Sequence, residues 1–114
     1  MDNGWKNEIY NALSSIDGAE VYFQYPEAEP DFPCITYSRL GQNTETYADD
    51  GAYIDSIEMK LDVWDTDPDN AEVIANSVSS KLKDIEYYET FRCDLYEYGT
   101  PPLHHVSMRF KKVY

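Results

Sequence analysis

The sequence predicts an α+β fold in which two helices pack on one face of a mainly antiparallel sheet. Apolar residues recur at helical spacing in two segments, and they alternate with polar residues in several others. Turn-forming Gly, Pro and Asp residues separate these segments. Because 114 residues can bury one core but not two, we expect a single α+β domain over residues 1–114, with the element order α-β-β-β-α-β-β.

The first helix is predicted by a single apolar face, with Asp2 or Asn3 available as N-cap and Gly18 placed to end it. The apolar residues are Trp5, Ile9, Ala12, Leu13 and Ile16. Residues 21–25 form a short strand-like run, and the three prolines after it predict an extended loop or a frayed edge.

A strand resumes at residues 34–40 and is followed by the polar residues 41–51, which are typical of a loop tip. We expect residues 41–52 to be mobile in the isolated subunit and to become ordered on assembly. The next strand has the clearest alternation in the chain. Its apolar residues, expected to face the helices, are Ile57, Met59, Leu61 and Val63, and its polar residues, expected to face outward, are Glu58, Lys60 and Asp62.

The second helix begins where Asp67 can act as N-cap and Pro68 suits the first turn. Its apolar face consists of Ala71, Ile74, Ala75, Val78, Leu82 and Ile85. Two more strands follow, separated by a turn at residues 99–102. Their alternating apolar residues are Phe91, Cys93 and Leu95, then Val106, Met108 and Phe110. We expect the apolar faces of strands and helices to bury each other.

The net charge of −13 and the pI near 4.2 argue against a protein that grips a nucleic-acid backbone, since that contact requires many cations. Three of the nine Lys and Arg residues, Arg109, Lys111 and Lys112, lie in the last six positions. They form the one locally basic patch of the sequence. This patch is either a solvated strand end or a contact with the acidic surface of another copy.

The cysteines Cys34 and Cys93 show no CxxC or Cys/His spacing, and the chain does not begin with a signal-like segment. Both features favour a reducing, cytoplasmic origin. Each cysteine lies in a predicted strand, where we expect a small core residue rather than a reactive thiol. No run of apolar residues is long enough for a membrane span, so we expect a soluble protein with no membrane partner.

No residue pattern predicts a metal site, a cofactor or a catalytic centre. Asp65, Asp67 and Asp69 match the opening of a calcium-binding loop, but Asn70 and Asn76 stand where that loop needs Gly and Glu, so helix capping is the expected role. The adjacent histidines, His104 and His105, point to opposite faces of a strand and cannot share a metal. We therefore expect no catalytic residues, no cofactor and no enzyme.

The order of elements and several segments resemble the small tail-completion and head-tail joining proteins of long-tailed bacteriophages and prophages. The resemblance extends from about Trp5 to Tyr114. Its most telling segments are P-C-I-T-Y entering a strand, L-D-V-W-D before a helix, and the terminal M-R-F-K-K. None of these is a catalytic signature.

The resemblance implies a virion structural protein, assembled in the bacterial cytoplasm, that forms a homo-oligomeric ring at the neck or tail end. A hexamer is one option, and tail-terminator, neck and minor-capsid roles stay open. Other neck or tail proteins would be its partners, and DNA would pass through without specific binding. Carboxylates lining the channel would repel the phosphates of DNA.

Two other function classes fit the residues. An acidic protein can mimic DNA and inhibit a nucleic-acid-binding protein. A small enzyme would require His104 to share a pocket with Cys34 or Cys93. For the ring, we expect subunit contacts to involve a polar segment and the basic end: Thr44, Tyr47, Asp49 and Asp50, then Arg109, Lys111 and Lys112.

Overall fold

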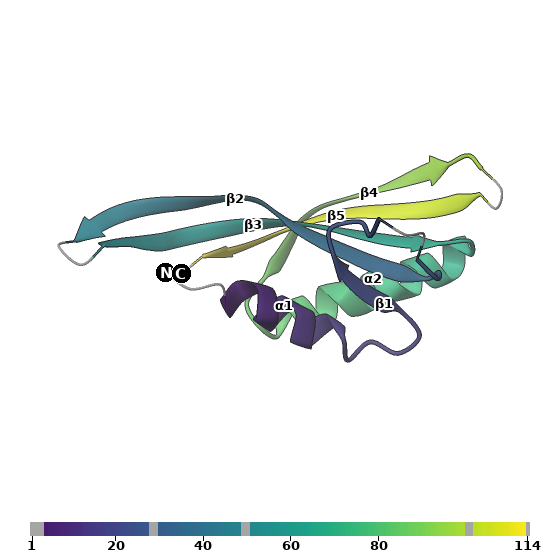
Figure 1. Ribbon diagram of the computed structural model, residues 1–114, viewed down its shortest axis with the longest axis horizontal. Coiled ribbons are helices and arrows are strands. Elements are labelled where there is room, and N and C mark those ends of the chain that lie inside the picture. The colour runs from purple at the N-terminus through teal and green to yellow at the C-terminus, as the bar shows by residue number, and fades with distance from the viewer. Residues whose placement is uncertain (1–3, 28–29, 49–50, 100–101, 114) are drawn as a thin grey trace.

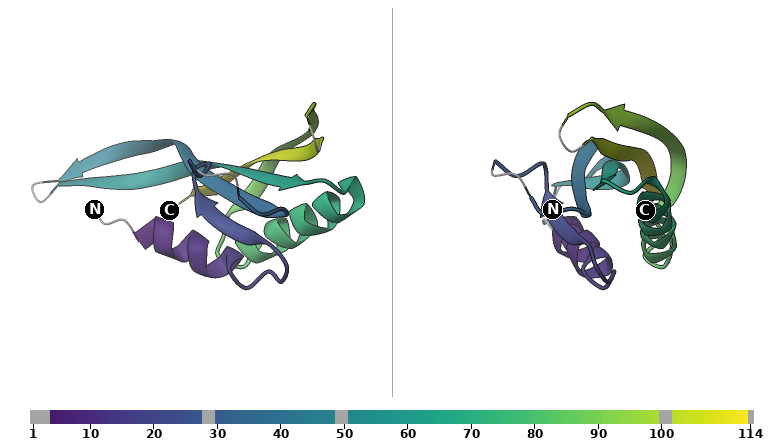
Figure 2. Two further views of the ribbon diagram at one scale, coloured as in Figure 1. Left: turned by 45° about the vertical axis from the view of Figure 1, so that its right-hand side comes forward. Right: turned by 90° about the vertical axis from the view of Figure 1, so that its right-hand side faces the viewer.

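Five strands form one sheet, and both helices lie on the same face of it (Figures 1 and 2). The computed structural model describes residues 4–27, 30–48, 51–99 and 102–113, without the side chains of residues 43–55. The elements are α1 (Gly4–Leu13), β1 (Glu20–Phe23), β2 (Cys34–Ala48), β3 (Gly51–Asp65), α2 (Pro68–Lys83), β4 (Tyr88–Glu97) and β5 (Leu103–Val113). The predicted fold class and element order are confirmed.

The strands lie in the order β1-β2-β3-β5-β4, so β1 and β4 are the two edges of the sheet. The pairing of β1 with β2 is parallel, and the other three pairings are antiparallel. The strand predicted at residues 21–25 is β1, which ends before the proline-containing connection. Its parallel pairing makes the sheet mixed at one edge.

The core lies between the helices and the inner face of the sheet. The β3 residues predicted to face the helices, Ile57, Met59, Leu61 and Val63, are fully buried. From β5, Val106, Met108 and Phe110 join them, as predicted. The helices contribute Trp5, Ile9 and Leu13 from α1 and Ala71, Ile74, Ala75, Val78 and Leu82 from α2. The predicted apolar faces of both helices are therefore core faces.

The predicted cap of α2 is confirmed, whereas α1 ends at Leu13, five residues before Gly18. Asp67 caps α2, and its carboxylate accepts hydrogen bonds from the backbone N–H groups of Asp69 at 2.9 Å and Asn70 at 3.4 Å. After α1, Gly18 adopts φ = +82°, a left-handed conformation that suits glycine. Asp2 and Asn3, the candidate caps of α1, lie outside the described residues.

The prediction of a loop at residues 41–51 is wrong. Strand β2 continues to Ala48 and β3 begins at Gly51, and the two strands pair as far as these residues, with three register shifts between Arg39 and Thr46. The threonines and tyrosines here favour strands. The backbone N–H and C=O groups, which in a polar loop would bind water, form hydrogen bonds with the partner strand instead. Asp49 and Asp50 lie outside the described residues.

Residues 42–48 and 51–55 form an arm that extends past the helices (Figure 1). The pairing of β3 with β5 ends at Ser56 and Val113, so the β3 half of the arm pairs with β2 alone. The described structure measures 55 × 27 × 23 Å, and the arm accounts for one end of the long axis. A two-stranded hairpin is only marginally stable by itself.

We predict that the arm opens more readily than the rest of its own strands. In the purified chain, amide hydrogens of residues 51–55 should exchange at least about tenfold faster than those of residues 59–63, because only the latter lie between two neighbouring strands. Hydrogen exchange read by mass spectrometry on short peptides measures both ranges in one sample. Equal protection of the two ranges would contradict this prediction.

The expectation that Phe91, Cys93 and Leu95 are buried against the helices is also wrong. These residues point away from the helices, and the inner face of β4 instead carries Arg92, which binds Glu72 of α2 at 2.7 Å and Asn76 at 2.9 Å. A register shift lies between Glu89 and Phe91. Strand β4 sits at the sheet edge beside the polar side of α2, so its apolar residues do not reach the core.

Candidate assembly surface

The sheet face opposite the helices carries a row of cations. The strand register places Lys60 of β3 directly opposite Arg109 of β5, and Glu58 opposite Lys111. The Lys60 side chain is 43% exposed and Arg109 is also exposed. Like charges directly opposite each other on neighbouring strands are destabilising. The pairing of Lys60 with Arg109 thus concentrates positive charge in a chain whose net charge is −13.

An apolar stripe lies next to these cations on edge strand β4. Phe91 and Leu95 are each 48% exposed, and Cys93 between them is partly exposed. Phe91 pairs with Arg109 in the register, and the guanidinium lies 5.5 Å from the centre of the Phe91 ring. The β4–β5 surface, as we name it, consists of Lys60, Phe91, Cys93, Leu95, Arg109 and Lys111. Exposed apolar groups on a sheet edge are typical of protein contacts.

The three candidate residues of the basic end are not equivalent. Arg109 and Lys111 lie on the face away from the helices, as the alternation with Val106, Met108 and Phe110 predicts. Lys112 lies on the helix side, where its Nζ is 3.2 Å from Glu8 of α1 and 5.4 Å from the ring centre of Tyr87. Lys112 therefore ties the C-terminal strand to α1.

Two of the four candidate residues of the polar segment, Thr44 and Tyr47, belong to the arm. Thr44 and Tyr47 lie on β2, where their backbones pair with Ile54 and Ala52. Their side chains, and all of Asp49 and Asp50, are outside the described part of the chain. The structure thus brings Arg109 and Lys111 together, whereas Tyr47 pairs with Ala52, which lies six residues along β3 from Glu58, the partner of Lys111.

The outward face also contains a buried polar pair that sequence reasoning missed. Asp62 was expected to be exposed, but it is buried and its carboxylate lies 2.5 Å from Nε2 of His105. The Trp64 ring stacks on His105 with 3.7 Å between ring centres, and Tyr25 packs on Trp64 at 5.3 Å. The connection between β1 and β2 thereby shields a site on the face that alternation alone marks as solvent-exposed.

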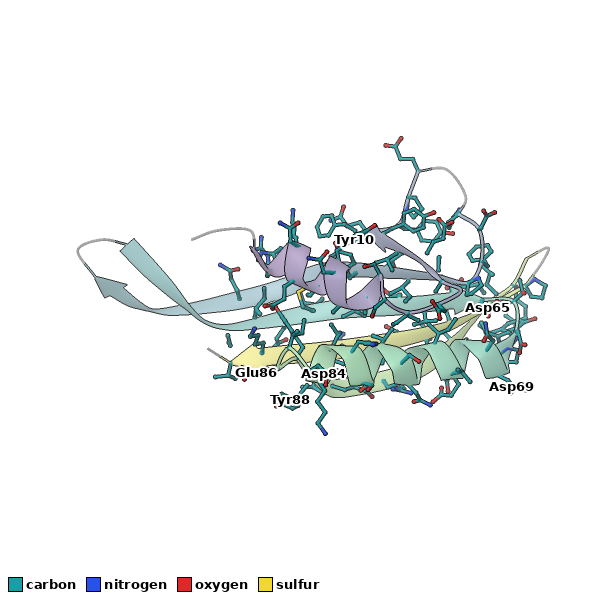
Figure 3. All side chains as sticks on the ribbon, turned by 90° about the horizontal axis from the view of Figure 1, so that it is seen from below. Tyr10, Asp65, Asp69, Asp84, Glu86 and Tyr88 are labelled. Atoms are coloured by element: carbon teal, nitrogen blue, oxygen red, sulfur yellow. The ribbon has the colours of Figure 1, made fainter. Side chains whose placement is uncertain are left out.

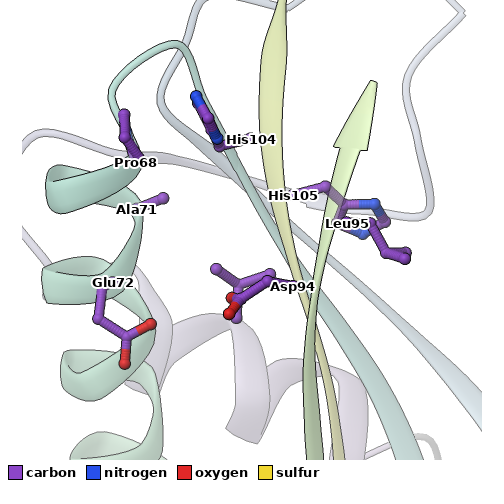
Figure 4. A pocket seen from close by; sticks show the side chains of 8 residues that line it. Pro68, Ala71, Glu72, Asp94, Leu95, His104 and His105 are labelled. Atoms are coloured by element: carbon purple, nitrogen blue, oxygen red, sulfur yellow. The ribbon is translucent and has the colours of Figure 1, made fainter. Parts of the chain in front are cut away.

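His104 and His105 both line a pocket of about 250 Å³ between the first turn of α2 and strands β4 and β5 (Figure 4). Glu72 and Asp94 line it together with His104, and neither cysteine does. Burial raises the pKa of the Cys34 thiol to about 12, helped by the nearby carboxylates of Glu20 and Asp65. A thiol so strongly protonated is a poor nucleophile.

The aspartates of the calcium-like motif act in local structure. Asp67 caps α2, while Asp65 is buried and accepts hydrogen bonds from the Thr66 backbone and from the Asn70 side chain, both at 2.7 Å. Across the described residues, no three His, Cys, Asp or Glu side chains are grouped to hold a metal ion. Neither described helix is long and apolar enough to cross a membrane.

A comparison with protein families decides the broad identity of this chain. The sequence pattern of the family described as Tail completion protein gp17 matches residues 10–114. The chain belongs to this family of phage tail completion proteins. It is therefore a structural protein of a bacteriophage tail, and family membership implies contact with other tail or neck proteins. No match was found among curated proteins.

Membership of the tail completion family agrees with the resemblance seen in the sequence, and it gives the β4–β5 surface a context. A tail protein works by contacting its neighbours, and this surface combines exposed aromatic, aliphatic and cationic groups. Of the residues predicted from sequence, it contains Arg109 and Lys111. Sequence reasoning missed Lys60, Phe91, Cys93 and Leu95, because alternation does not reveal which apolar residues of a strand lack a helix to cover them.

Proposed function

We propose that this tail completion protein forms an oligomeric ring at the head-tail junction or at the tail end, for which six subunits is one option. The observation that carries the proposal is the β4–β5 surface, an apolar and cationic patch on the uncovered sheet face of a strongly acidic chain. A neighbouring copy offers the carboxylates that such a patch attracts. Contact between copies also covers Phe91 and Leu95, which stay partly exposed in a single subunit.

The acidic charge of the chain suits a ring through which DNA passes. Exposed carboxylates lie at both ends of α2, with Asp69 near its start and Asp84 and Glu86 beyond its last turn (Figure 3). Carboxylates facing a channel repel phosphates, so DNA would move through without specific binding. Assembly would take place in the bacterial cytoplasm, with the ring then kept in the virion. Family membership supports this tail role over a minor-capsid role or a DNA-mimicking inhibitor.

We predict that reversing the charge of the β4–β5 surface blocks joining of heads and tails without unfolding the chain. Arg109→Glu combined with Lys111→Glu places acids against an acidic neighbour, while both side chains lie off the core. Phage lacking this protein is complemented with the variant, and joined particles are counted by electron microscopy. We expect at least about a tenfold loss of joined particles and an almost unchanged melting curve.

The matched control reverses two other exposed lysines, Lys81→Glu with Lys83→Glu, in the last turn of α2. This pair makes the same change in net charge on a helix, on the other side of the sheet from Arg109 and Lys111, so joining should stay close to the wild-type level. Association of wild-type subunits should also weaken with added salt, since exposed charges are screened over about 8 Å at physiological ionic strength. Normal joining by the Arg109 and Lys111 double variant would refute the role of this surface.

A further inference from the structure

We infer that the arm of one subunit docks on the β4–β5 surface of a second copy of the same chain. This inference rests on the proposed ring and specifies which surfaces meet in it. Both surfaces belong to this chain. Each has a strand edge without a neighbouring strand, and the two carry opposite charges.

Strand β4 is an edge that the chain leaves open. It pairs with β5 on one side only, and it contains neither proline nor lysine, two residues that commonly protect sheet edges. Its one arginine, Arg92, is turned to the helix side, where it binds Glu72 and Glu89. The outward side of β4 is therefore apolar at Phe91, Cys93 and Leu95, and its backbone can accept one more strand.

The arm lacks a third strand. Residues 51–55 pair with β2 alone, because β5 ends opposite Ser56. Three or more strands, or a covering helix, are normally needed to stabilise a hairpin in water. The edge of β4 in a second copy supplies that strand.

The charges of the two surfaces are complementary. Residues 41–55 include the acids Glu45, Asp49, Asp50 and Asp55 and no lysine or arginine. The β4–β5 surface carries Lys60, Arg109 and Lys111, with Glu58 opposite Lys111 and Asp62 at 3.7 Å from Lys60 as partial offsets. An acidic arm on this surface would relieve the repulsion between Lys60 and Arg109.

Tyr47 in the arm lies too far from Cys93 on the β4–β5 surface of the same subunit for the two to meet. Tyr47 pairs with Ala52, whereas Cys93 pairs with Ser107, which in turn pairs with Asp62. Ala52 and Asp62 lie on the same strand. At about 3.3 Å per residue, the position of Tyr47 is therefore roughly 33 Å along the sheet from that of Cys93. Contact is therefore between subunits, and because it joins two different patches it repeats head to tail, which is the arrangement that closes a ring.

Disulfide trapping in assembled tails tests this contact. Cys93 is the native reporter, since Cys34 is buried and its thiol has a raised pKa. Thr46→Cys and Tyr47→Cys are introduced separately, because neighbouring strand residues point to opposite faces. A disulfide needs Cα atoms within about 7 Å, so no bond can form inside one chain. After mild oxidation, at least one of the two variants should give a ladder of covalent oligomers on a non-reducing gel.

Two controls and a parallel reaction separate the outcomes. Adding Cys93→Ser to either variant should abolish the ladder. A second control moves the reporter cysteine to α2, by combining Val73→Cys with Cys93→Ser and Tyr47→Cys. Val73 is 61% exposed but lies off the β4–β5 surface, so this control should give no ladder. An amine-reactive cross-linker applied to the same tails reports the ring whichever surfaces meet. A ladder with that reagent but with neither cysteine variant would overturn the arm contact and leave the ring. If neither the cross-linker nor oxidation of either cysteine variant gives a ladder, both the arm contact and the ring are overturned. Disulfide-linked dimers without larger species would overturn the head-to-tail arrangement.

Discussion

Leu61→Ala should lower the free energy of unfolding by about 2 to 5 kcal/mol, the usual cost of removing a fully buried leucine side chain and leaving a cavity. Leu61 lies on the central strand β3, between Tyr37 of β2 and Met108 of β5, and all three side chains are buried. Both flanking strands and the helices restrict relaxation around the cavity. Urea denaturation of the purified chain measures the change.

The control for this substitution is Lys60→Ala on the neighbouring position of the same strand. Its side chain points to the opposite face and is 43% exposed, so the free energy of unfolding should change by about 0.5 kcal/mol or less. A change below about 0.5 kcal/mol for Leu61→Ala itself would show that the β3 face is assigned the wrong way round.

Asp62→Ala should destabilise the chain by about 1 to 3 kcal/mol, although the alternation of β3 marks this position as an outward one. The substitution leaves the buried imidazole of His105 without the carboxylate 2.5 Å away, and it also removes the longer contact of Asp62 with Lys60 at 3.7 Å. Asp62→Asn keeps a side-chain oxygen that can accept the hydrogen bond, so its effect should be smaller. Thermal and urea unfolding of the two variants give the comparison.

A double-mutant cycle with His105→Ala isolates the interaction between the two side chains. Because Asp62 and His105 are in direct contact, the coupling energy should be at least about 0.5 kcal/mol. Additive effects of the two substitutions would show that Asp62 stabilises the chain through other contacts. The stacked Trp64 ring makes His105→Ala disruptive by itself, and the cycle corrects for that loss.

The buried Asp62 and His105 pair and the β4–β5 surface occupy the same sheet face and have different roles. Trp64 and Tyr25 cover the pair, so it stabilises the chain and is closed to a neighbour. Phe91, Leu95 and Arg109 have no such cover within the described chain and stay exposed. Substitutions in the first group should therefore alter unfolding, and those in the second should alter assembly.

The sequence by itself determined the fold class, the order of elements and the family. Both helices have one apolar face, and Asp67 marks the start of α2; these are local properties that depend on few distant contacts. The alternation in β3 identified core residues such as Leu61, because β3 lies in the middle of the sheet and one of its faces meets the helices directly.

Only the tertiary structure decided which surfaces are left for assembly. Alternation shows that Phe91, Cys93 and Leu95 share a face, but strand pairing at the sheet edge decides that this face points away from the helices. Packing around His105 buries Asp62, and the pairing of β2 with β3 makes strands of the described residues in the expected loop at 41–51. The physical reason is that the direction of a side chain alternates along its own strand and can be read from the sequence. Whether that side chain is buried depends on residues from other elements, which are distant in sequence.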